Sequence, residues 1–160
     1  MSDKITIIQF SLGAASFGIN VHQTIEVERY VELSSLPRMP RFVAGFINLR
    51  GQIIIVMDLR KQLGLRINQP TSESRILIAE ISKEPYGFIV DSVEDIKEVP
   101  RSEVRAAGDF ALKVSDHLVV GVIVEENEWI TILNFNTLIK ESELKALRRL
   151  QDETKRKNTA

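Results

Sequence analysis

The segment from residue 43 to residue 57, VAGFINLRGQIIIVM, constrains the fold of this chain more than any other stretch. It holds two apolar runs, and Arg50 is its only charged residue. The second run is rich in β-branched side chains and follows Gly51, which favours a strand buried on both faces over a helix. The segment therefore predicts a hairpin of strands 43–48 and 52–57 around a tight turn. The cation at that turn is either a solvated turn residue or part of a contact surface.

Most of the remaining chain has the pattern of short strands, and their order repeats. The first hairpin resembles residues 119–135, with Gly45 corresponding to Gly121 and Asp58 to Asn134. Two related β-units that face each other would produce such a repeat, and chance similarity is the alternative. Further strands are predicted at 4–10, 16–22, 75–81, 86–90, 118–124 and 129–133.

Two helices are predicted. A short one follows Asp58, a typical N-cap residue, and ends at Gly64, a typical residue after a helix C-terminus. A longer one covers residues 136–153, because leucine recurs near one face of such a helix. The chain, 1–160, is expected to be a single domain in which residues 4–74 form mainly the first β-subdomain and 75–135 mainly the second, with strand exchange possible, while 136–160 form a C-terminal helix and tail.

Composition excludes several classes of function. Lys plus Arg is 21 and Asp plus Glu is 22, a balance that argues against nucleic acid as the main partner, because phosphate binding usually leaves a basic excess. The absence of cysteine excludes disulfides, thiol catalysis and thiolate metal sites. No stretch approaches the roughly 18–20 apolar residues of a membrane span, and the N-terminus lacks the pattern of a signal peptide. We therefore expect a cytoplasmic protein without membrane insertion.

The sequence offers little for catalysis. His22 and His117 lack metal-ligand spacing, and the glycines are scattered singly rather than gathered in a phosphate-binding loop. Adjacent carboxylates such as Glu125 and Glu126 are more typical of a charged turn than of acid–base chemistry. Trp129 falls in an apolar strand pattern, which predicts a position in the core. The chain is therefore expected to bind rather than to catalyse, with no cofactor and no metal.

The hairpin turn also carries a resemblance. The stretch FVAGFINLRGQ at 42–52 is followed by an apolar run, then DLR and LG. Together with FSLG at 10–13, FGI at 17–19 and YGFIVDSV at 86–93, it resembles the CheW family of chemotaxis coupling proteins, over about residues 4–140. The resemblance implies a mostly β fold of two SH3-like five-stranded β-barrels around a shared hydrophobic core. It also implies a non-enzymatic adaptor that links methyl-accepting chemotaxis receptors to the histidine kinase CheA.

The resemblance further implies partners and contact residues. The partners are the regulatory domain of a CheA-type kinase and the cytoplasmic tip of a receptor, bound by a protein that is a monomer alone and is recruited to membrane-associated receptor arrays. The alternatives are a small nucleic-acid-binding barrel, another protein-interaction module, or a hydrolase with an unrecognised carboxylate pair. The residues that match the family's signature turn are Asn48, Leu49, Arg50 and Gly51, and those that match its receptor side are Glu26, Val27, Val93 and Ile96. Asp58 is read equally as a helix cap or as a contact.

Overall fold

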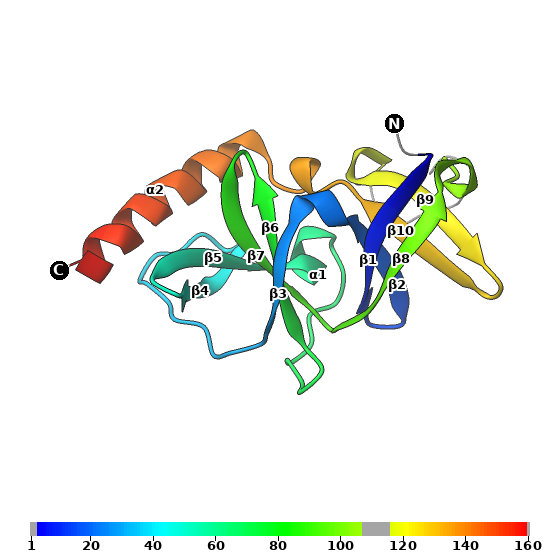
Figure 1. The fold of residues 1–160 in the computed structure, drawn as a ribbon. Helices are drawn as coiled ribbons and strands as arrows, with labels where there is room; N and C mark the ends of the chain where they lie inside the picture. Colours follow the sequence, from blue (N-terminus) through cyan, green and yellow to red (C-terminus); the bar gives the residue numbers. More distant parts are fainter. Residues whose placement is uncertain (1–2, 107–115, 160) are drawn as a thin grey trace.

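The computed structural model describes residues 3–106 and 116–159, and its strands form two five-stranded sheets (Figure 1). The mostly β fold with two β-units is therefore confirmed. The elements in chain order are β1 (Lys4–Leu12), β2 (Ala15–Asn20), β3 (Thr24–Arg29), β4 (Val43–Leu49), β5 (Gln52–Asp58), α1 (Leu59–Gln62), β6 (Arg75–Ile81), β7 (Glu84–Val90), β8 (Ser92–Pro100), β9 (Val119–Glu125), β10 (Glu128–Leu133) and α2 (Glu141–Thr159).

The two sheets repeat one another in strand order. Sheet A has the order β8-β1-β2-β10-β9, and sheet B has the order β3-β6-β7-β5-β4. In each sheet, two antiparallel hairpins are joined by one parallel contact, β2 with β10 in sheet A and β7 with β5 in sheet B. The similarity between the hairpin at 43–58 and residues 119–135 therefore reflects equivalent places in two related sheets.

Strand exchange interlocks the two halves of the chain. β3 follows β2 in sequence but pairs with β6 in sheet B, while β8 follows β7 but pairs with β1 in sheet A. The sheets consequently do not divide the chain at residue 74. Each half of the sequence contributes strands to both sheets, so neither half carries a complete sheet of its own.

One hydrophobic core is shared by both sheets and by α2. The ring of Phe135, in a short 3₁₀ turn after β10, packs edge-on against Phe10 of sheet A and Phe88 of sheet B, with centroid separations of 6.4 and 5.1 Å. Such edge-to-face contacts add to the stabilisation from burial. The side of α2 that faces this core presents Leu144, Leu147 and Leu150.

The elements differ from the sequence prediction in a few places. α2 begins at Glu141 rather than at residue 136, because the 3₁₀ turn Phe135–Thr137, capped by Asn134, comes first. β8 was not predicted, since its many charged residues hide its strand pattern. Trp129 is not in the core: 51% of it is exposed, on the outer face of β10. Among the described residues, no helix is long and apolar enough to cross a membrane.

Candidate interaction surfaces

The signature turn joins β4 to β5 through two residues with left-handed backbone conformations. Arg50 has φ 51° and Gly51 has φ 88°, and positive φ at both positions is what a type I′ hairpin turn requires. The Asn48 side-chain oxygen accepts a hydrogen bond from the Gly51 backbone N–H at 2.8 Å. Asn48 and Gly51 therefore shape the turn, which presents the side chain of Arg50.

The Arg50 guanidinium braces the sheet to which it belongs. Its Nη2 lies 2.5 Å from Glu26 Oε1, and its Nη1 lies 3.6 Å from Glu28 Oε1. Both carboxylates belong to β3, which is at the opposite edge of sheet B from β4. A backbone bridge between Ser34 and Phe46 also joins the segment that follows β3 to β4. Sheet B is thus curled on itself, and 68% of the Arg50 side chain still faces solvent.

β3 turns its apolar side chains outward. Ile25 and Val27 are exposed, whereas the Glu26 and Glu28 side chains on the other side of the strand are 28% and 32% exposed and pair with Arg50. This is the reverse of the usual alternation on a half-buried strand. The inward carboxylates are tolerated because Arg50 supplies their counter-charge.

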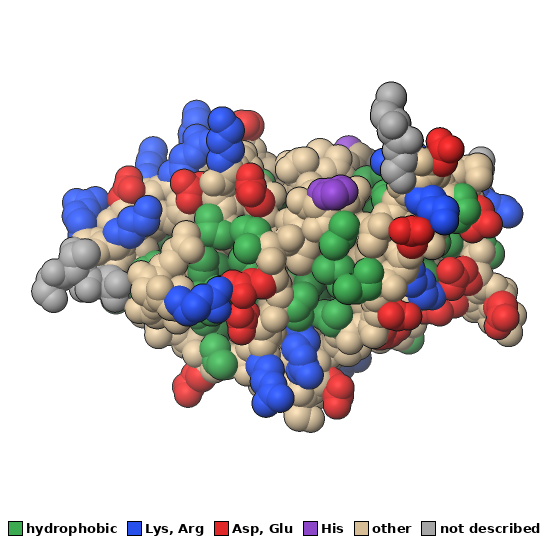
Figure 2. Space-filling view, viewed as in Figure 1, with side chains coloured by type: hydrophobic (Ala, Val, Ile, Leu, Met, Phe, Trp, Pro, Cys, Tyr) green, Lys and Arg blue, Asp and Glu red, His purple; other side chains and the backbone are tan. Residues whose placement is uncertain are grey.

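A second strand contributes to the same face. Ile96 on β8 is 64% exposed, and Val93, near the start of β8, is half-buried against the shared core. Figure 2 shows hydrophobic side chains gathered in the middle of this face, between β3 and β8. We call Ile25, Val27 and Ile96 the β3–β8 surface. It combines residues from two sheets and is a candidate interaction surface.

A buried guanidinium joins the two sheets behind this face. Asp58 caps α1, accepting a hydrogen bond from the Arg60 backbone N–H at 3.0 Å, and its other oxygen lies 3.1 Å from Arg60 Nη2. Arg60 Nη1 forms an ion pair at 3.1 Å with Asp91, which lies between β7 and β8. The angle between the two groups is unsuitable for a hydrogen bond. Asp91 in turn accepts the Gly13 N–H in the β1–β2 turn. Sequence reasoning named Asp58 but not Arg60, because the Asp91 contact depends on how the strands are exchanged.

α1 ends as its sequence suggests. Leu63 closes the last turn, and Gly64 follows with φ 72°, a left-handed conformation that glycine adopts without strain. Gly64 and Asp58 thus have structural roles in the sequence between β5 and β6.

Sheet A carries a separate exposed apolar area on its β9–β10 hairpin. Val124 lies directly across from Trp129 in the strand pairing, and Val120 is exposed farther along β9. We call these three residues the β9–β10 surface. Beside Trp129 a cavity of about 810 Å³ opens, lined in part by Phe17, Leu65, Arg66 and Thr131.

Carboxylates surround the turn of this hairpin. Glu125 binds Lys97 Nζ at 2.6 Å, and this hydrogen bond raises the pKa of Lys97 above its usual value. Gln9, buried in β1, donates to Glu128 at 2.8 Å and to Glu94 at 3.1 Å. These hydrogen bonds hold Glu94, Glu125 and Glu128 beside the hairpin.

Exposed apolar surfaces on a β fold are typical of proteins that bind other proteins. Within the described ranges, no three His, Cys, Asp or Glu side chains are grouped to hold a metal ion, and neither His22 nor His117 belongs to such a group. Residues 6–143 match the family model of the CheW-like domain, so the chain belongs to the CheW family.

Individual relatives agree with this assignment. The chemotaxis protein CheW of Bacillus subtilis is 31% identical over 142 residues, which cover 88% of this chain and 91% of that protein. A probable chemotaxis protein CheW of Rhizobium etli is 25% identical over 140 residues, covering 88% and 90%. The crystal structure of the scaffolding protein TtCheW from Thermoanaerobacter tengcongensis superposes with a TM-score of 0.79 at 28% identity, covering 88% of this chain and 90% of that one.

Proposed function

We propose that this protein is a non-enzymatic adaptor that couples methyl-accepting chemotaxis receptors to the histidine kinase CheA. The observation that carries the proposal is the β3–β8 surface, in a chain that belongs to the CheW family. Its strand β3 places Ile25 and Val27 in water and covers its glutamates, an arrangement that gains nothing for the isolated fold. Burial of those side chains against a partner would be favourable.

The β3–β8 surface is suited to a helical partner. An amphipathic helix binds by laying apolar side chains spaced one turn apart into a groove or onto an apolar strip. Val27 on β3 and Ile96 on β8 would receive such side chains, with Val93 behind them and Glu26 beside them. The cytoplasmic tip of a receptor, which is helical in this family, is the proposed occupant.

Arg50 supports this surface from within. Its pair with Glu26 and Glu28 holds β3 in the orientation that exposes Ile25 and Val27. Loss of Arg50 would free two glutamates to turn outward and would lower receptor affinity through the position of β3. The signature turn, Asn48 to Gly51, therefore has two proposed roles. It braces β3, and it presents Arg50 as an exposed cation at the interface.

The experiment is a binding measurement with purified receptor fragment and purified CheA. Ile96→Ser should weaken receptor binding roughly tenfold or more, since truncating a central apolar contact costs more than about 1.4 kcal/mol. Ile67→Ser is the matched control, because Ile67 is an exposed isoleucine that lies outside the β3–β8 surface and its loss should leave binding unchanged. Capture of neither partner by the parent protein would refute the coupling role.

The Arg50 variants separate bracing from contact. Arg50→Ala removes both functions, whereas Glu28→Gln weakens only the brace, because Glu28 is not among the proposed receptor contacts. If Arg50 acts through β3, Glu28→Gln should also weaken receptor binding, though less than Arg50→Ala does. We further propose that the free protein is monomeric and cytoplasmic and joins membrane-associated arrays through its partners.

A further inference from the structure

We propose that the cavity beside Trp129 binds a small organic anion with an aromatic body. The cavity of about 810 Å³ opens between sheet A and the segment that joins α1 to β6. Small-molecule sites are typically crevices of roughly 300–1,000 Å³ with apolar walls and a few polar groups, and they often lie between parts of a protein. The proposal goes beyond the adaptor function and does not depend on it, because it concerns a small ligand rather than a partner protein.

Sheet A supplies the apolar wall of the cavity. Thr131 on β10 lies beside Phe17 on β2, and strand alternation places Trp129 on the same face as Thr131. Phe17 is buried, whereas 51% of Trp129 is exposed. Leu65, which packs against the shared core, lines the cavity from the segment after α1. An aromatic ring in the cavity would lie against the Trp129 indole and remove apolar surface of both groups from water.

Two arginines line the cavity, and one of them is available to a ligand. The Arg60 guanidinium is already paired with Asp58 and Asp91. Arg66 is exposed, and in the described part of the chain no carboxylate forms an ion pair with it. A guanidinium binds a carboxylate through two parallel hydrogen bonds. Arg66 is therefore the cation that holds the anionic group of the proposed ligand.

One carboxylate is found among the described residues that line the cavity, and it points away from the apolar wall. Glu128 directly precedes Trp129 in β10, so its side chain lies on the opposite face of the strand. There its Oε1 accepts hydrogen bonds from Gln9, at 2.8 Å, and from Ser16. The face that carries Trp129 thus opposes Arg66 with no negative charge of its own, which favours an anionic ligand over a cationic one.

Small residues leave the cavity open beside the β1–β2 turn. Gly13, Ala14 and Ala15 are exposed and line the cavity. A Cβ built on Gly13 would have no heavy atom of the surrounding structure within 4 Å. Ala15 lies two residues before Phe17 in β2 and so shares its face. A larger side chain at Ala15 would therefore extend into the space that the ligand needs.

The test uses naphthalene carboxylate as the probe and the corresponding uncharged amide as its matched control. Calorimetry should give one site for the carboxylate with a Kd of about 1 mM or lower, given the free energy that a ligand of this size can gain per atom. The amide should bind roughly tenfold more weakly, because it cannot form a charge-assisted pair with Arg66. In nuclear magnetic resonance spectra, the carboxylate should shift the signals of the Gly13 amide and the Trp129 indole N–H.

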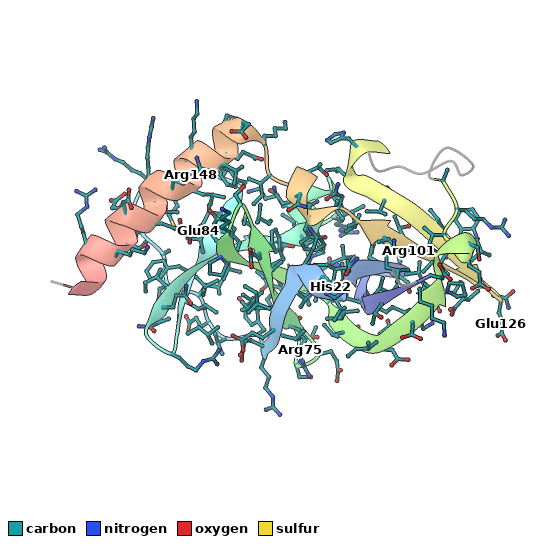
Figure 3. All side chains as sticks on the ribbon, turned by 45° about the horizontal axis from the view of Figure 1, so that its top comes forward. His22, Arg75, Glu84, Arg101, Glu126 and Arg148 are labelled. Carbon is teal, nitrogen blue, oxygen red and sulfur yellow. The ribbon has the colours of Figure 1, made fainter. Side chains whose placement is uncertain are left out.

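Three variants assign the site. Arg66→Gln should lower the affinity for the carboxylate roughly tenfold, to that for the amide. Arg148→Gln is the matched control and should leave binding unchanged, because Arg148 is an exposed arginine on α2, at the opposite end of the molecule from the hairpin tip at Glu126 (Figure 3). Ala15→Phe, which fills the cavity without changing its charge, should abolish binding of both probes.

Several results would overturn the proposal. One is the absence of carboxylate binding at millimolar concentration. Another is equal affinity for the carboxylate and the amide, which would mean that the ligand is not recognised by its charge. Binding that survives Ala15→Phe would place the ligand on another apolar surface of the protein. None of these outcomes changes the expected binding of receptor or kinase, so the adaptor function is tested separately.

Discussion

Replacement of Arg60 by methionine should destabilise the protein by about 3 kcal/mol. Only 3% of the Arg60 side chain is exposed, and it neutralises Asp58 and Asp91 while donating to the Asn68 carbonyl at 2.7 Å. Methionine fills similar space but leaves two carboxylates without a counter-charge. Removing one partner of a buried ion pair costs roughly 3–5 kcal/mol. The lower end applies here, because Asp91 is 27% exposed and water partly solvates it.

Urea unfolding followed by circular dichroism measures this loss. The midpoint should fall while the slope with denaturant stays constant, since the surface exposed on unfolding is unchanged. Arg50→Met is the matched control: it also removes an arginine with two carboxylate partners, but Arg50 is 68% exposed, so its loss should cost about 0–1 kcal/mol. Asp91→Asn, added to Arg60→Met, should recover part of the stability.

Equal small losses for the Arg60 and Arg50 variants would refute this reasoning. They would mean that the buried cluster is solvated well enough to need no counter-charge. A failure of Asp91→Asn to recover any stability would instead place the cost in lost packing or in the Asn68 hydrogen bond.

Three further predictions concern the core, the signature turn and alkaline pH. Leu147→Ala, which truncates a fully buried leucine of α2, should cost about 2–5 kcal/mol in chemical denaturation. Gly51→Ala places a side chain at φ 88° and should cost about 1–2 kcal/mol in the same measurement. Burial, and then the charge of Glu84, raise the pKa of the Tyr86 phenol against the opposing charge of Arg148. The neutral Tyr86 phenol therefore contributes its full share of stability below about pH 10. That contribution is lost as pH rises through the higher pKa of the folded state, because the unfolded chain ionises first. Tyr86→Phe should reduce that alkaline loss of stability, which urea unfolding at increasing pH measures.

Local chemistry was enough to predict much of the fold. The hairpin of β4 and β5 follows from two apolar runs around Gly51, because a tight turn and its flanking strands are neighbours in sequence. Asp58 and Gly64 bracket α1 for the same reason. The correspondence of Gly45 with Gly121 pointed to two related sheets, and the strand orders agree with it.

Exposure could not be predicted in the same way. The alternation in β3 shows that Ile25 and Val27 share one side, but it does not say which side faces water. The pairing of β3 with β6 decides this, and it places Glu26 and Glu28 on the side that meets Arg50. The prediction that Trp129 lies in the core was wrong for a related reason. An apolar strand residue is buried only if another part of the protein covers that face of its sheet.

The sequence alone determined most of the strands, the signature turn and the family of this protein, since each depends on residues close together in the chain or on motifs that can be recognised one at a time. The tertiary structure decided which apolar side chains remain in water and how the two sheets are joined. Arg60 and Asp91 meet only because the chain passes from sheet B to sheet A between β7 and β8. A contact between residues brought together by strand exchange has no signature in the local pattern of either partner.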